Sequence, residues 1–234
     1  MGIMISHRWD LGEQLVDYQV AWQRQRDLHQ AVVEGGADTT LLLEHASVYT
    51  AGRRTARWDR PTDGTPVVDV DRGGRITWHG PGQLVAYPVV RLAEPVDVVA
   101  YVRALEQAVI DTCAHWGITA ERIEGRTGAW VRGQGLVPDR KIAAIGVRVA
   151  RGVTMHGVAI NACPDLAAFS AIVPCGITDA GVTSLSELAG KTVTVTDCAD
   201  AFEPHLLEAL TPLLARRPHP GAVMSGVRSG ALLA

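Results

Sequence analysis

Short apolar runs, broken by glycine, proline and polar residues, dominate the first 90 residues of the chain. Each run is only a few residues long, which is typical of buried β-strands. A loop rich in Arg, Asp, Pro and Gly separates the second run from the third. The pattern therefore predicts a series of short strands. The runs are residues 39–45, 47–52, 66–71, 75–80 and 84–90.

Apolar residues recur at helical spacing in three other segments, residues 13–34, 97–117 and 197–214. Asp97 is a suitable N-cap for the second segment, and "SLSE" (184–187) has the capping-box pattern of a brief further helix ending near Gly190. The residues expected to face inward are Leu15, Tyr18, Trp22, Leu28 and Val32 in the first segment, Val98, Val102, Leu105, Val109, Cys113 and Trp116 in the second, and Phe202, Leu206, Leu210 and Leu213 in the third.

The stretch "KIAAIGVRVARGVTMHGVAINA" (141–162) contains two extended runs on either side of Arg151-Gly152. These two residues suit a tight hairpin turn. Counting outward from such a turn places Gly146 directly opposite Gly157. Two facing glycines would leave a notch without side chains, in which an extended ligand could lie against the backbone.

Strands interleaved with few helices, together with an antiparallel hairpin, favour an α+β fold with a mixed β-sheet flanked by helices. A doubly wound parallel sheet fits this order less well. Residues 1–215 are expected to form a single domain. The segment 216–234 lacks periodicity and is expected to be a loosely ordered tail.

Composition and charge narrow the classes of function. A chain of 234 residues, 47% hydrophobic, can bury one sizeable core. It contains no apolar run long enough to cross a bilayer and no secretion signal, so we expect a cytoplasmic protein with no membrane partner. A net charge of −3 argues against nucleic acid. The basic stretch "GRRTAR" (52–57) is either a solvated loop or a docking point for an acidic partner.

The four cysteines show no metal-ligand spacing, so we expect no metal site. Cys175, in the apolar run "AIVPCGI", is either a packing residue or a nucleophile that needs a base nearby. Only two of the 22 basic residues are lysines, Lys141 and Lys191. Lysine can lose its proton in a suitable site, whereas arginine effectively cannot. A Cys-His-Asp triad that uses Asp165 or Asp179 is a further possibility.

The hairpin count places Lys141 opposite Ala162, at the open end from which the chain continues toward Cys175. This geometry lets the lysine and the cysteine meet. The glycine-rich stretch "DRGGRITWHGPGQ" (71–83) permits close backbone approach to a ligand, or it forms two tight turns around an ordinary strand. It lacks the GxxxxGK[ST] pattern of a phosphate loop, so no nucleotide cofactor is expected.

Five ordered motifs resemble the lipoyl(octanoyl) transferase family over roughly residues 10–215. They are "DRGGRITWHGPGQLVAYPVV", "GRTGAWV", "KIAAIGVRV", "MHGVAINACPDLAAFSAIVPCGI" and "TSLSEL", preceded by the strand and loop "LLLEHASVYTAGR". The resemblance implies the fold of biotin and lipoate protein ligases. It also implies transfer of octanoyl from acyl carrier protein to a lysine of a lipoyl domain, as found in 2-oxoacid dehydrogenase acyltransferase subunits and the glycine-cleavage H protein. We expect no cofactor and a monomer.

Carried over by motif, Cys175 corresponds to the thiol that accepts the acyl group and Lys141 to the lysine that activates it. The residues that the resemblance assigns to the substrate pocket are Arg72, Gly73, Gly74, Arg75, Ile76, Thr77, Trp78, His79, Ala144, Ile145, Gly146, Gly157, Val158 and Ala159. The chain departs from the family pattern in two places. It has Ala46-Ser47 where a proline is usual, and it carries the variable stretch "RGQGLVPD" (132–139).

Three alternatives stay open at this point. An ATP-dependent lipoate or biotin ligase relative would not need Cys175. A non-catalytic acyl-binding protein would form no covalent adduct. A cysteine hydrolase would use water as the final acceptor.

Overall fold

The structure of the chain is a computed structural model that describes residues 4–61, 65–135, 137–172 and 180–215. Its centre is a mixed sheet in the order β1-β2-β6-β10-β9-β8-β7, with β11 paired to β9. The pairs β1–β2 and β9–β11 are parallel and the other pairs are antiparallel. Its strands are β1 (Ile5–Arg8), β2 (Thr39–Leu43), β6 (Gln83–Val89), β7 (Glu121–Ile123), β8 (Arg126–Val131), β9 (Arg140–Ala150), β10 (Val153–Asn161) and β11 (Gly181–Val182).

A second, smaller sheet lies beside the first, in the order β4-β3-β5. It consists of β3 (Val48–Ala51), β4 (Val67–Asp69) and β5 (Ile76–His79). The helices are α1 (Tyr18–Val33), α2 (Val98–Ala114), α3 (Leu185–Ala189) and α4 (Val195–Leu210), with short 3-10 turns at Arg57–Asp59, Leu166–Ala171 and Thr211–Leu213. In the described residues, no helix is long and apolar enough to cross a membrane.

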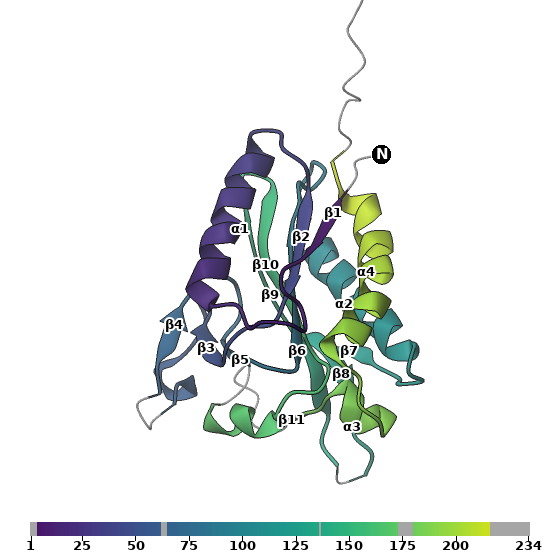
Figure 1. Ribbon diagram of the computed structural model, residues 1–234. Helices are drawn as coiled ribbons and strands as arrows, with labels where there is room; N and C mark the ends of the chain where they lie inside the picture. Colours follow the sequence, from purple (N-terminus) through teal and green to yellow (C-terminus); the bar gives the residue numbers. More distant parts are fainter. Residues whose placement is uncertain (1–3, 62–64, 136, 173–179, 216–234) are drawn as a thin grey trace, which may run out of the picture.

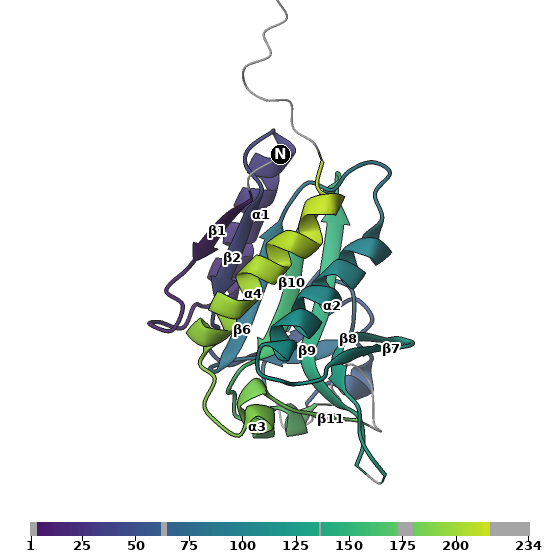
Figure 2. The same ribbon diagram turned by 90° about the vertical axis from the view of Figure 1, so that its right-hand side faces the viewer.

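The helices cover the two faces of the main sheet. Helix α1 packs on one face, and α2 and α4 lie side by side on the other (Figures 1 and 2). The largest buried cluster joins α2 and α4 to the sheet through residues such as Leu105, Phe202 and Ile142. A mixed sheet flanked by helices is therefore confirmed as the fold class. The predicted tail, residues 216–234, lies outside the described residues.

The hairpin of β9 and β10 has the predicted register. Arg151 and Gly152, with φ angles of 52° and 72°, form its turn, as expected of a two-residue hairpin loop. Gly146 pairs with Gly157. The expected pairing of Lys141 with Ala162 is wrong, because the ladder between these strands ends at Ala143–Ile160.

On the edge of β9 away from β10, Lys141 pairs with Trp130 of β8, and it also pairs with Val182 of β11. A register shift interrupts the β8–β9 ladder between Ala129 and Trp130. Ala162 leaves the sheet, and its backbone N–H donates to the carbonyl of Gly82 at 3.1 Å. The open end of the hairpin is therefore built from strands that the local count did not include.

Two predicted helix boundaries are also wrong. The first helix begins at Tyr18 rather than residue 13, because the N–H of Val16 donates to the carbonyl of Glu44 and holds this segment in an extended bridge. Leu15 is consequently 48% exposed. The last helix begins at Val195, where Thr194 and Asp197 form a capping box, and ends at Leu210 before a 3-10 turn.

Helix α2 has the predicted N-cap. The Asp97 carboxylate accepts a hydrogen bond from the N–H of Ala100 at 2.9 Å. Cys113 is fully buried, as expected, and burial raises the pKa of its thiol to about 12. Val98 is not buried, however. It is 41% exposed and its neighbour Val99 is 69% exposed, so the first turn of α2 faces outward.

Candidate active site

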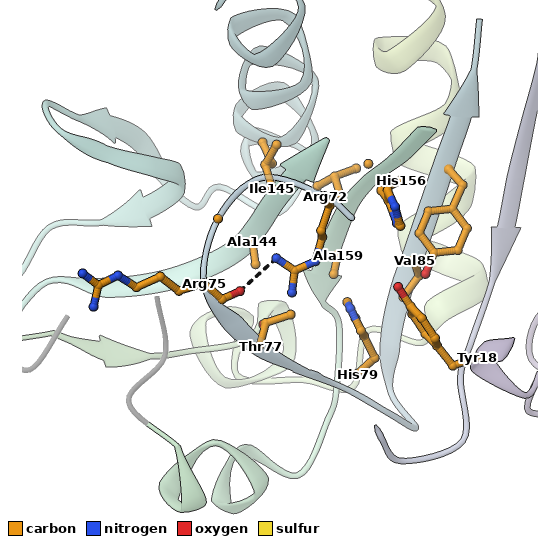
Figure 3. Close-up of a pocket in the computed structure, with 15 residues that line it drawn as sticks. Tyr18, Arg72, Arg75, Thr77, His79, Val85, Ala144, Ile145, His156 and Ala159 are labelled. Atoms are coloured by element: carbon orange, nitrogen blue, oxygen red, sulfur yellow. Dashed lines mark hydrogen bonds between the residues drawn. The ribbon is translucent and has the colours of Figure 1, made fainter. Parts of the chain in front are cut away.

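An inner cavity lies where β5 and the loop before it meet β9 and β10. Three segments that are far apart in the sequence line it, and they are the three that the sequence assigns to the substrate pocket. The predicted residues among its lining are Arg72, Gly74, Arg75, Thr77, His79, Ala144, Ile145, Gly146, Gly157, Val158 and Ala159. Figure 3 shows these segments converging from the two sheets.

Three predicted pocket residues do not line the inner cavity. Successive side chains of a strand point to opposite faces, so Thr77 and His79 face the cavity while Ile76 and Trp78 face the other way. Ile76 and Trp78 instead belong to a separate buried cluster with Phe169. The third residue, Gly73, lines a neighbouring cavity and donates its N–H to a carbonyl of β9 at 2.9 Å.

The Arg72 side chain occupies the centre of this region (Figure 3). It is 6% exposed. Its guanidinium donates to both oxygens of Thr50 at 2.9 Å and to the carbonyls of Gly73 and Arg75 at 3.0 and 2.9 Å. A buried cation needs such partners, and these bonds fasten the loop over the cavity to β3.

The prediction that the two facing glycines leave an empty notch is wrong, because neighbouring atoms occupy the space beside each glycine. A Cβ atom on Gly146 would lie 2.9 Å from Cδ of Arg72. A Cβ atom on Gly157 would lie 2.2 Å from the carbonyl oxygen of Ala86 on β6. The glycines therefore permit close packing of an arginine and of a neighbouring strand.

Four other residues line the inner cavity, Tyr18, Val85, Tyr87 and His156, and the sequence motifs assign none of them to the pocket. Tyr18 was expected on the buried side of its helix, and the ring of Tyr18 stacks on His79 with centroids 6.0 Å apart. Burial raises the pKa of Tyr18 to about 12. The sequence feature that could have indicated a pocket here is the presence of polar aromatic residues inside segments that otherwise resemble core.

His45 supports one wall of the cavity through Tyr87. The Nδ1–H of His45 donates to the carbonyl of Val16, so its Nε2 accepts from the Tyr87 hydroxyl, each at 2.8 Å. Burial lowers the pKa of His45 to about 4. The ring is therefore neutral at pH 7 and can accept this hydrogen bond.

His156 and Asp71 form a second polar pair at the cavity. His156 has a φ of 58°, an unusual backbone conformation for a residue with a side chain. Its Nε2 lies 2.8 Å from a carboxylate oxygen of Asp71. The hydrogen bond from His156 lowers the pKa of Asp71 to about 2, and burial lowers the pKa of His156. A neutral imidazole thus donates to an ionised carboxylate.

Lys141 does not line the inner cavity. It is 6% exposed, and its Nζ lies 4.6 Å from the centroid of the Trp130 ring. Lys141 lines a neighbouring groove, and this groove shares four lining residues with the inner cavity. The shared residues are Gly74, Arg75, Ile145 and Gly146. The structure therefore brings Lys141 to the edge of the predicted pocket.

A chain of hydrogen bonds connects the inner cavity to the strand beside Lys141. His79 donates from Nδ1 to the amide oxygen of Gln83 at 2.8 Å, and the Gln83 amide donates to Asn161 at 2.9 Å. Asn161 in turn donates to the carbonyl of Thr183 at 2.9 Å. The N–H of Thr183 donates to the Lys141 carbonyl at 3.0 Å. This network fixes the position of the lysine's backbone.

Cys175 and Asp179 lie outside the described residues, so their predicted roles stay predictions. The described residues that flank this part of the chain are Ile172, which packs with Trp78, and Val182, which pairs with Lys141. Asp165, the other proposed triad carboxylate, caps a 3-10 turn by accepting from the N–H of Ala167 at 2.9 Å.

The chain is similar to proteins of one family over most of its length. The family model described as "Lipoyl protein ligase A/B catalytic domain" matches residues 17–207. An octanoyltransferase of Salinispora arenicola is 62% identical over 192 residues, which cover 82% of this chain and 90% of that protein. An octanoyltransferase of Mycobacterium avium is 60% identical over 208 residues, which cover 88% of this chain and 89% of that protein.

Solved structures show the same fold. A crystal structure of lipoate-protein ligase A bound with ATP superimposes with a TM-score of 0.68 and 15% sequence identity. The match covers 90% of this chain and 85% of that one. At this level of identity the likeness concerns the fold alone. It agrees with the ligase-like architecture that the sequence motifs implied.

Proposed function

The chain belongs to the octanoyltransferases of the lipoyl protein ligase A/B catalytic domain family, and from this membership we propose how its residues carry out acyl transfer. The donor is octanoyl-acyl carrier protein and the acceptor is the target lysine of a lipoyl domain. Such domains occur in 2-oxoacid dehydrogenase acyltransferase subunits and the glycine-cleavage H protein. The acyl group passes through a thioester on Cys175.

The observation that carries the proposal is the convergence of the three predicted pocket segments on one cavity beside Lys141. Apolar side chains from β6, β9 and β10 supply contacts for a medium-length alkyl chain. They are Val85, Ala144, Ile145, Val158 and Ala159. Arg72 holds the loop that closes this cavity, and its hydrogen-bonding groups face backbone oxygens of the loop and Thr50.

The reaction has two displacements. The Cys175 thiolate attacks the octanoyl thioester carbonyl, forms a new S–C bond and releases the carrier thiolate, which takes the proton that Lys141 removed from Cys175. The acceptor amine then attacks the Cys175 thioester, forms the amide and restores the thiol. Lys141 serves as the base that removes a proton from the thiol and then from the amine. Because conversion of a thioester to an amide is downhill, no nucleotide is consumed.

The test is intact-mass analysis after mixing the protein with octanoyl-acyl carrier protein, followed by peptide mapping. We expect the mass of one octanoyl group on the peptide that contains Cys175. The Cys175→Ser variant should carry no thioester and should stop transfer to a lipoyl domain. A Cys163→Ser variant is the matched control, since Cys163 is an exposed cysteine. An adduct on another residue, or a normal rate for Cys175→Ser, would remove the assignment.

The same assay separates the alternatives. An ATP-dependent ligase would transfer octanoate only when nucleotide is added. A hydrolase would release octanoate to water instead of forming the amide. A non-catalytic acyl-binding protein would show neither an adduct nor a modified lipoyl domain.

A further inference from the structure

A groove on the α2 side of the sheet meets the inner cavity at their four shared residues. We call it the arginine groove. Lys141 lies in its wall. The other residues that line it are Arg54, Gly73, Gly74, Arg75, Val98, Val99, Val102, Arg103, Glu106, Ile123, Gly125, Arg126, Thr127, Ile145, Gly146 and Val147. A molecule in this groove would therefore reach both the inner cavity and the proposed base.

The charge of the groove differs from that of the whole chain. The described residues of its lining include four arginines, Arg54, Arg75, Arg103 and Arg126, and one carboxylate, Glu106. Arg75 also lies 3.3 Å from the buried Asp59, and Arg126 lies 3.9 Å from Asp139, at the limit of an ion pair. Glu106 is only 1% exposed and is already paired with Arg103 and Arg122 at 2.7 and 3.2 Å. The complete chain, by contrast, has a net charge of −3. Arginine side chains are thus concentrated along this groove.

The groove also has an apolar wall. The first turn of α2 contributes Val98 and Val99, which are 41% and 69% exposed, and the strand β9 contributes Val147. Scattered exposed valines are ordinary, but these line one wall of a groove that has arginines around it. The groove therefore suits a flexible ligand that carries both an anionic group and aliphatic or amide segments.

We propose that the arginine groove binds the phosphodiester-linked arm on which an acyl carrier presents its thioester. The inference rests on the proposed function. Arg54 and Arg126 contact the phosphate, whose oxygens accept the paired N–H groups of a guanidinium. The chain of the arm lies along the valines, and the thioester reaches the junction of the groove with the inner cavity.

The other substrate fits this groove poorly. The acceptor is a lysine side chain, which approaches as an ammonium ion, and the arginines of the groove would repel it. The phosphate of the donor arm is attracted by the same arginines. Charge complementarity therefore assigns the groove to the donor.

The experiment compares free phosphopantetheine with pantetheine as inhibitors of octanoyl transfer from the carrier protein. The two compounds differ only in the phosphate. We expect phosphopantetheine to inhibit about tenfold more strongly, the effect of one charge-assisted contact. The two compounds should inhibit the double variant Arg54→Gln/Arg126→Gln equally. The KM of this variant for the carrier protein should rise. Arg24→Gln, which removes an exposed arginine from α1, should behave as the unmodified protein.

Three outcomes would overturn the inference. The two compounds could inhibit the unmodified protein equally, the double variant could keep the preference for phosphate, or its KM could rise for the lipoyl domain instead of the carrier. A protein that transfers no octanoyl group from the carrier would instead reject the proposed function, and this inference with it. The two kinds of failure are distinguishable, because octanoyl transfer remains measurable when only the groove inference fails and is absent when the proposed function fails.

Discussion

Two buried basic side chains near the site, those of Arg72 and Lys141, have different surroundings. Arg72 donates to oxygens of Thr50, Gly73 and Arg75, so its charge is held by the backbone and it fixes a loop. Lys141 lies against the Trp130 ring at the edge of a groove. An arginine suits the fixing of a loop because it stays protonated. A lysine at position 141 is, by contrast, a residue type that can exchange a proton.

The need for a proton acceptor at residue 141 can be tested by substitution. Lys141→Arg should lower the rate of octanoyl transfer at least about 100-fold, because general-base catalysis contributes that much and a guanidinium cannot act as the base. The folded structure should survive, which a thermal melt would check. Lys191→Arg is the control, since Lys191 is exposed and lies outside both cavities. Retention of most of the activity by Lys141→Arg would reject the role as base.

Individual site residues differ in how well the sequence reveals them. Lys141 stands out because the chain uses arginine almost everywhere else. Asp71 and His156 are 85 positions apart in the sequence, and their hydrogen bond depends on how β10 meets the loop before β5. Tyr87 lies in an apolar strand and resembles core until its bond to His45 is seen. Such pairs follow from tertiary contacts and have no local signal.

At the scale of elements, the β9–β10 hairpin depends on backbone contacts that only glycine allows. Gly157→Ala would place a Cβ atom 2.2 Å from the carbonyl oxygen of Ala86, and neither backbone can move without disturbing the central sheet. We expect a loss of about 1–3 kcal/mol in the free energy of unfolding, the usual cost of overpacking. Urea denaturation would measure it.

The matched control for Gly157→Ala is Gly181→Ala. The added Cβ at Gly181 would meet only Cγ of Arg140, at an ordinary contact distance of 3.4 Å, so the free energy of unfolding should change little. Equal effects of the two substitutions would show that the close approach at Gly157 does not constrain the sheet.

The elements that the sequence predicted well are those with local causes. The Arg151-Gly152 turn sets the register of the hairpin, and Asp97 and Ser184 begin their helices as N-caps. The errors have non-local causes. The segment before α1 is held by β2, and the first turn of α2 lines a groove instead of packing on the core. Periodicity cannot distinguish a valine that faces a core from one that faces a groove.

At the scale of the whole molecule, the main sheet separates two environments. The inner cavity is surrounded by buried aromatic and polar side chains of α1, β5 and β6, and the arginine groove lies on the side covered by α2. Residues of β9 reach both sites, as Ile145 and Gly146 do. A single strand thus connects the proposed place of the acyl chain to the proposed entrance. That one domain spans residues 1–215, and that it acts as a monomer, stay predictions.

Buried neutral histidines make the stability of the molecule sensitive to acid. Burial lowers the pKa of His45 to about 4, from an ordinary value of 6.5, and lowers the pKa values of His79 and His156 in the same direction. Above pH 6.5 these groups are neutral in both the folded and unfolded chain and do not change the balance. As the pH falls from 6.5 toward 4, the unfolded chain takes up protons that the folded chain excludes.

Stability should therefore fall across that interval, and His45 alone should remove about 2 kcal/mol between pH 7 and pH 5. Urea denaturation at the two pH values would measure the loss. His45→Gln, which keeps one side-chain donor and one acceptor for Val16 and Tyr87, should show a smaller difference between the two pH values, because glutamine does not titrate. If this variant lost as much stability on acidification as the unmodified protein, His45 would not be the neutral group that supports the cavity wall.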